Sequence, residues 1–186
     1  MQPESLKLLS PLRVVLALVV VALLALLGRY EYWVEVEHRF QTITEGRLYK
    51  SGEMPSEELV DRVGSLGIRT VIDLRDEVSE VIDAERDALE KAGVKYVNLP
   101  SKQVPEETTV DTYLTLMKRP ENFPVLIHCE HGVGRSVLFA ALYRIEFEGW
   151  GSERARCATT YFPWRGSFKP DSPKGEYLRN YKPRSR

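Results

Sequence analysis

The stretch that most constrains the fold runs from an apolar segment through a short loop into a helical pattern: PVLIH, then CEHGVG, then RSVLFAALYRI. A short apolar run bounded by turn residues is typical of a strand buried on both faces. A buried strand that leads directly into a helix is the building unit of a sheet covered by helices. The loop, with Gly132 and Gly134, must therefore turn where the strand meets the helix.

The chain from Phe40 onward repeats this alternation of β-branched runs and amphipathic stretches. It predicts an α/β fold with a central, mostly parallel sheet flanked by helices, and one domain over residues 40–162. The predicted strands lie within 46–52, 68–75, 94–100 and 124–128, and the predicted helices within 55–67, 77–93, 105–119, 135–149 and 152–162.

Residues 1–39 are predicted to form a membrane anchor and juxtamembrane segment, because Val14 to Leu27 is uninterrupted apolar sequence. At ~1.5 Å per residue this run covers ~21 Å of a ~30 Å hydrocarbon layer, so flanking residues complete one transmembrane helix. Tyr30, Tyr32 and Trp33 suit the headgroup boundary. A cleaved signal peptide is the alternative, although no small-x-small cleavage site follows the run. The very short leader favours a single-pass protein with its amino end inside and its carboxyl part exported.

Charge and cysteine content exclude several classes of function. The net charge of −1 and the lack of a basic stripe argue against nucleic-acid binding. Residues 163–186 are predicted to be a basic tail. Cys129 and Cys157 form no CxxC pair, and no pair of candidate ligands has the spacing of a known zinc site. We therefore predict no disulfide framework, no metal and no other cofactor, and we leave the oligomeric state open.

The loop has the chemistry of an anion site. Backbone N–H groups at a helix amino end are unpaired, and two glycines allow successive N–H groups to converge on one point. Such a cradle stabilises a thiolate, which makes Cys129 a candidate nucleophile. Arg135 can bind two phosphate oxygens at once, and Ser136 can donate its hydroxyl to the sulfur.

The stretch HCEHGVGRS resembles the signature HCxxGxxR(S/T) of the cysteine-based tyrosine and dual-specificity phosphatase superfamily, and residues 44–162 resemble its small dual-specificity-like members. The resemblance implies hydrolysis of a phosphate monoester through a cysteinyl-phosphate, without metal. It implies that Cys129 is the nucleophile, Arg135 the phosphate clamp, Ser136 the helper of the leaving thiolate, and His128 a buried neighbour that holds the loop. The phosphate-binding loop would comprise Glu130, His131, Gly132, Val133, Gly134 and Arg135.

Two other loops fit less well. A nucleotide-binding loop requires GxxxxGK(S/T), but Cys129 stands at the first glycine and Arg135 at the lysine. The rhodanese-type cysteine loop is generally shorter than the five residues between Cys129 and Arg135.

Four further residues receive weaker predictions. Asp73 and Arg75 end a predicted strand at the edge of the sheet that should carry the site, so Asp73 is expected to fix a loop and Arg75 to lie near the site. Cys157 is expected to be a small core residue, with a role as resolving thiol for Cys129 as the alternative. His38 is assigned no role.

The general acid is where this sequence departs from the family pattern. Dual-specificity relatives carry an aspartate about thirty positions before the cysteine to protonate the leaving group. Here the region reads VNLPSKQVPEE, which contains no aspartate. Glu106 and Glu107 are the first candidates for the acid, and Asp111 is the third.

The leading function is a membrane-anchored tyrosine or dual-specificity protein phosphatase that acts on phosphorylated proteins. The first alternative is a phosphatase of lipids or small molecules. The apolar segment favours it, whereas Glu130 and the lack of lysines in the loop disfavour a highly anionic head group. The second alternative is a pseudoenzyme that only binds phosphate, against which the intact Cys129 and Arg135 argue.

Overall fold

The computed structural model describes residues 10–76, 80–159 and 168–184. The chain divides into two compact units, Met1–Glu37 and His38–Arg186. The predicted boundaries at residues 39 and 162 are not tested by this division and stay a prediction.

The first unit contains helix α1 (Pro11–Glu35), which begins with a proline at its first turn. None of its residues is buried. By length and composition α1 is long and apolar enough to cross a membrane, a criterion that a signal sequence also meets. A core helix of a soluble domain would be mostly buried, and α1 is not.

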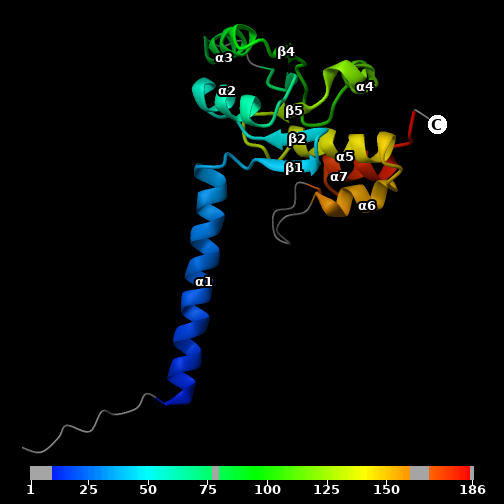
Figure 1. The fold of residues 1–186 in the computed structure, drawn as a ribbon. Helices are drawn as coiled ribbons and strands as arrows, with labels where there is room; N and C mark the ends of the chain where they lie inside the picture. Colours follow the sequence, from blue (N-terminus) through cyan, green and yellow to red (C-terminus); the bar gives the residue numbers. More distant parts are fainter. Residues whose placement is uncertain (1–9, 77–79, 160–167, 185–186) are drawn as a thin grey trace, which may run out of the picture. The chain divides into compact units, whose positions relative to one another are not determined.

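The second unit is built on one sheet with the strand order β1-β2-β5-β3-β4 (Figure 1). Strands β2, β5, β3 and β4 are parallel, and β1 pairs antiparallel with β2 at one edge. The predicted mostly parallel sheet is confirmed, while β1 was not predicted. The strands are β1 (Gln41–Thr44), β2 (Leu48–Ser51), β3 (Thr70–Asp73), β4 (Lys95–Asn98) and β5 (Val125–His128).

Five of the helices in this unit fall within predicted ranges, and a sixth, α7, lies in the segment predicted to be a tail. Gly67 (φ +62°) and Gly93 (φ +73°) follow α2 and α3 in the left-handed conformation that commonly ends helices. The helices are α2 (Ser56–Ser65), α3 (Glu80–Lys91), α4 (Glu107–Met117), α5 (Arg135–Phe147), α6 (Ser152–Ala158) and α7 (Pro173–Asn180), with a short 3₁₀ turn, η1 (Pro120–Asn122).

The sheet separates two hydrophobic cores, because successive strand residues point to opposite faces. On one face Ile72 and Ile127 pack with α4, α5, α6 and α7. On the other face Val71 and Leu126 pack with α2 and α3. Figure 1 shows α5, α6 and α7 grouped together and α2 beside α3. Leu178 of α7 is completely buried, so the described part of the basic segment is packed into this unit.

Candidate active site

The loop that contains Cys129 emerges from the middle of the sheet. In the parallel register of β5 with its neighbours, His128 lies opposite Ser51 of β2 and Asp73 of β3. The carboxyl ends of three strands therefore surround the loop, which is where open α/β sheets bind ligands.

Glycine stands at the two positions of the loop for different structural reasons. Gly132 has a φ of +65°, and a Cβ atom there would lie 2.5 Å from the backbone nitrogen of Gly52. Gly134 has a φ of −120° and needs no left-handed backbone, but a Cβ there would approach the tips of Gln103 and Lys174 at 3.2 Å. Only Gly132 thus supplies the bend that the sequence analysis assigned to both.

A buried lysine on strand β2 supports the loop through hydrogen bonds. Lys50 of β2 is 0% exposed, and its Nζ donates to the carbonyl oxygens of Gly132 at 2.9 Å and Arg39 at 3.1 Å. Burial lowers the pKa of Lys50 to about 8, against the opposing effect of Cys129. The sequence analysis missed Lys50, although a lysine inside a strand expected to be buried is a signal in itself.

The sulfur of Cys129 lies under the first turn of α5. Cys129 is 2% exposed, and its Sγ lies 3.4 Å from Oγ of Ser136 and accepts from the backbone N–H of Ser136 at 3.5 Å. These are the contacts that the predicted role of Ser136 requires.

Arg135 is the first residue of α5 and is 8% exposed. Its Nη1 donates to the carbonyl oxygen of Leu74 at 3.0 Å and to Oδ1 of Asp76 at 2.7 Å. These two partners from the segment after β3 hold the guanidinium beside Cys129.

A cavity of about 130 Å³ opens above the sulfur, and two of its lining side chains are cationic. Among the described residues that line it, none is a carboxylate. A small cavity with fixed positive charge suits a phosphate-sized anion. The lining residues are Gln103, Cys129, His131, Val133, Gly134, Arg135 and Lys174.

Glu130 does not line this cavity. Its carboxylate lies 3.4 Å from Nδ1 of His131 and 3.7 Å from Nη2 of Arg135, and its side chain is 48% exposed. Its carbonyl oxygen accepts from the backbone N–H of Glu53 at 3.0 Å. Of the six residues predicted to bind phosphate, the structure thus brings His131, Val133, Gly134 and Arg135 to the cavity, while Glu130 and Gly132 anchor the loop through backbone contacts.

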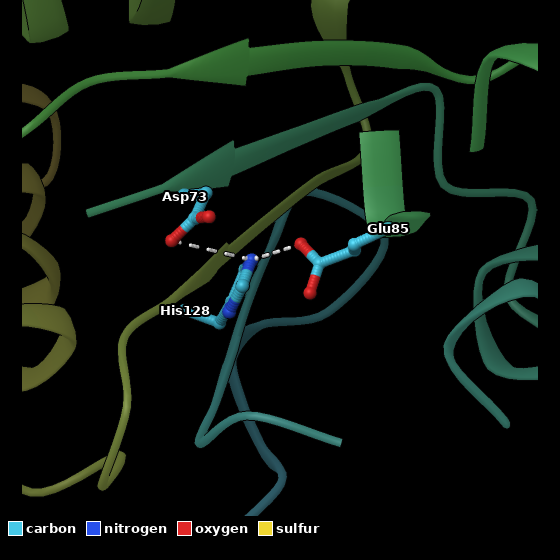
Figure 2. Close-up of side chains that lie close together, drawn as sticks. All are labelled: Asp73, Glu85 and His128. Atoms are coloured by element: carbon cyan, nitrogen blue, oxygen red, sulfur yellow. Dashed lines mark ion pairs between the residues drawn. The ribbon is translucent and has the colours of Figure 1, made fainter. Parts of the chain in front are cut away.

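Behind the loop lies a buried ionic cluster, which we call the rear cluster: Asp73, Arg75, Glu85 and His128. Figure 2 shows His128 between the two carboxylates, with Nε2 at 2.9 Å from Glu85 and 3.8 Å from Asp73. Arg75 binds Asp73 through Nε at 3.0 Å and Nη2 at 2.8 Å, and Nη2 also donates to Glu85 at 2.8 Å. Tyr96 donates its hydroxyl to Asp73 at 2.7 Å.

Opposite charges in the rear cluster stabilise one another. Burial by itself raises the pKa of Asp73, but the hydrogen bonds from Arg75 outweigh it, and the pKa lies below its ordinary value. Burial likewise works against the charge of Arg75, whose pKa is nevertheless raised by Asp73 and Glu85. Asp73 thus holds Arg75 in place, and Arg75 stands behind the loop and not in the cavity.

Asp73, Glu85 and His128 are also the described residues whose potential metal-ligand atoms all lie within 4.8 Å of one another. The guanidinium of Arg75 already donates to both carboxylates, so a metal ion there would meet a fixed positive charge. The donor set therefore fits an ionic network better than a metal centre. The sequence analysis missed Glu85, which stands between Ile82 and Leu89 on the buried face of α3.

The structure does not bring the candidate general acids to the cavity. Glu106 pairs with Lys102 at 2.8 Å, and Arg184 pairs with both Glu107 and Asp111. Neither Glu106 nor Glu107 lines the cavity in this structure, so a movement of either carboxylate over Cys129 stays a prediction. Their role as the acid stays a prediction that requires these pairs to open.

Two minor predictions also meet the structure here. Cys157 is exposed, which corrects its placement in the core. It follows Glu153 by four residues on α6 and so shares the solvent-facing side of that helix. His38, which received no role, lies with its Nε2 3.1 Å from Glu58.

Comparison with known proteins places this geometry in a family. The model of the family described as "DSP-PTPase phosphatase fused to NAD+ Kinase" matches residues 21–161, more than half of the chain. The dual specificity protein phosphatase TpbA of Pseudomonas aeruginosa strain UCBPP-PA14 is 34% identical over 110 residues, which are 58% of this chain and 47% of that protein. The chain thus spans about half the length of the curated relative that it matches.

Solved structures agree. The crystal structure of P. aeruginosa TpbA superposes with a TM-score of 0.60 at 25% identity, over 78% of this chain and 86% of that one. The core catalytic domain of the PP-IP phosphatase SIW14 from S. cerevisiae gives a TM-score of 0.63 at 18% identity, over 77% of this chain and 85% of that one, a likeness of fold alone. The chain is therefore a member of the family of DSP-PTPase phosphatases described as fused to NAD+ kinase, and its predicted place in the cysteine-based phosphatase superfamily is confirmed.

Proposed function

We propose that this chain hydrolyses phosphate monoesters through a cysteinyl-phosphate intermediate. The observation that carries the proposal is the sulfur of Cys129 at a small cavity, with the guanidinium of Arg135 lining the same space and Ser136 within 3.4 Å of the sulfur. A nucleophile, a clamp and a helper of the leaving thiolate thus meet at one point.

In the first step the thiolate of Cys129 attacks phosphorus. The sulfur–phosphorus bond forms while the bond to the leaving oxygen breaks. That oxygen keeps the electron pair and takes a proton from the general acid, which takes a proton back from the attacking water in the second step. Arg135 and the backbone N–H groups of the loop stabilise the charge on the other phosphoryl oxygens. In the second step water attacks phosphorus, the thiolate leaves with a hydrogen bond from Ser136, and inorganic phosphate is released.

Phosphorylated proteins are our first choice of substrate, with tyrosine or dual specificity. The matching relative TpbA is named as a dual specificity protein phosphatase, which supports this choice. A phosphatase of lipids or small phosphates is the second candidate. Lys174 favours it, because this lysine gives the cavity a cation that the loop sequence lacks.

We further propose that α1 anchors the protein in a membrane with its amino end inside and the phosphatase unit exported. The support for the anchor is the exposure of all of α1 together with its length and apolar composition. A cysteine-directed reagent that cannot cross the membrane tests the side. Labelling of Cys157, which is exposed, in intact cells supports export, and labelling only after lysis contradicts it.

The decisive experiment measures phosphate release from phosphotyrosine and phosphoserine peptides and from phospholipids, with C129S as the matched control. We expect turnover of at least one class, its loss in C129S, and no effect of a chelator. Activity that survives in C129S would refute the cysteinyl-phosphate mechanism. Loss of activity in the presence of the chelator would indicate that a metal ion is needed, and the rear cluster would be its candidate site.

A further inference from the structure

Lys174 is brought to the catalytic cavity from a distant part of the chain. It follows Cys129 by 45 residues, yet both line the same cavity with Arg135. Its Nζ donates to Oε1 of Gln103 at 2.7 Å, and both atoms lie 3.2 Å from where a Cβ of Gly134 would stand. The ammonium group thus rests directly against the phosphate-binding loop.

The position of Lys174 is fixed by the packing of α7. Gly175 is pressed against the segment before the helix, since a Cβ there would lie 1.8 Å from the carbonyl oxygen of Lys169. Ser172 caps the helix by accepting from the backbone N–H of Gly175 at 3.2 Å. Leu178 is completely buried. The backbone that carries Lys174 therefore has little freedom to move away.

The neighbours of Lys174 do not neutralise its charge. Gln103, which accepts its hydrogen bond, is neutral, and none of the described lining residues of the cavity is a carboxylate. Burial lowers the pKa of Lys174, Arg135 lowers it further, and Cys129 opposes both. A half-buried cation beside a second cation gains most when an anion enters the space between them.

We propose that Lys174 is a substrate-binding residue of the catalytic cavity, where its ammonium binds the phosphoryl group together with Arg135 while Gln103 holds it in position. The assignment rests on the proposed function for its substrate, a phosphate monoester. It makes the C-terminal segment part of the active site and explains why Gly134 carries no side chain: a Cβ there would crowd the tips of Lys174 and Gln103.

The test uses the full chain with K174M, with K174R as the conservative variant and K169M as the matched control. Lys169 is exposed and lies five residues earlier, so its replacement makes the same change of charge outside the cavity. Nitrophenyl phosphate turnover and inhibition by vanadate are measured, and thermal unfolding checks that each variant is folded.

We expect K174M to lower kcat/KM about tenfold to a hundredfold and to weaken vanadate inhibition by a similar factor, as for the loss of one hydrogen bond to a charged group. K174R should recover part of both, and K169M should stay within about twofold of the parent. Equal behaviour of K174M and K169M in a folded protein overturns the proposal.

Binding of inorganic phosphate to C129S separates this proposal from the proposed function. If the parent shows no turnover but C129S binds phosphate more tightly than C129S/K174M does, the phosphatase assignment fails and the role of Lys174 stands. If turnover is present and the two variants bind phosphate equally, the role of Lys174 fails alone. If C129S binds no phosphate, both fail.

Discussion

Two arginines stand on opposite sides of the loop that carries Cys129, and their surroundings differ. Arg75 in the rear cluster is bound by Asp73 and Glu85, both buried, and by Glu53 at 3.2 Å. Arg135 in the cavity has two partly exposed carboxylate partners, Asp76 at 2.7 Å and Glu130 at 3.7 Å, and otherwise contacts backbone carbonyl oxygens. An arginine whose charge is cancelled by buried carboxylates holds a structure together, whereas one that faces a cavity beside another cation is available to an anion.

The largest expected effect tests the cavity side of this comparison. R135K should lower kcat/KM at least about a hundredfold, because a lysine cannot bind two phosphoryl oxygens in a fixed plane. The free energy of unfolding should change by less than about 1 kcal/mol, since Arg135 has no buried carboxylate partner. Steady-state kinetics and urea denaturation measure the two quantities. A mild kinetic loss would mean that Arg135 is not the clamp.

The second prediction tests the rear cluster with the corresponding arginine. R75M should destabilise the fold by about 3–5 kcal/mol, because it leaves Asp73 and Glu85 buried without their cation. Activity per folded molecule should fall less than about tenfold. Urea denaturation, followed by assays at the folded fraction, checks both. If R75M is as stable as the parent but its turnover falls a hundredfold, Arg75 belongs to the active site, and the contrast drawn between Arg75 and Arg135 is wrong.

The third prediction concerns Lys50, the buried lysine that contacts the loop, and tests whether its pKa is lowered. Its pKa of about 8 in the folded state lies below the ordinary lysine value of 10.5. Between these pH values the unfolded chain keeps a proton that the folded chain has lost, so the free energy of unfolding should rise with pH. Raising the pH from 7.5 to 9.5 should stabilise the parent by about 2 kcal/mol relative to K50M. Equal responses of parent and K50M in urea denaturation would show that Lys50 titrates normally.

The smallest effects are expected at the exposed carboxylates. E106Q, E107Q and D111N each remove one exposed ion pair that solvent screens, so the stability of the fold should change little. Because none of them lines the cavity, the ratio of alkyl to nitrophenyl phosphate turnover should stay within about twofold of the parent. A selective loss on the alkyl substrate in one variant would restore that residue as the general acid.

The residues of the site that could be predicted from the sequence are those that lie next to one another along the chain. Strand β5, the loop and α5 follow one another without interruption, so the contact of Cys129 with Ser136 and the place of Arg135 at the helix start follow from local geometry. The alternation of β-branched runs with amphipathic stretches also predicted the sheet that carries the loop.

The remainder depends on tertiary packing that one sequence does not reveal. Lys174 and Gln103 come from segments far from the loop in the sequence. The loop itself contains no lysine, and the lysine that lines the cavity is supplied by α7. Glu85 and Lys50 break the rule that charged residues face solvent, and only the rear cluster and the loop carbonyls explain why they are buried. Glu107 and Asp111 looked available because their shared partner, Arg184, lies 77 and 73 residues further along the chain.

The contact between Gly52 and Gly132 bears on how this family can diverge. Two backbones meet there with no room for a Cβ, so a change at Gly132 could not be compensated by any side chain at position 52. The positive φ of Gly132 adds a second reason for glycine at that position, because other residues rarely adopt the left-handed conformation. The contact also means that the loop meets its anion already shaped, so that little of the binding free energy is consumed in ordering it. Selection for new substrates would therefore act on the residues around the cavity mouth, such as Gln103 and Lys174, while the loop itself stays the same.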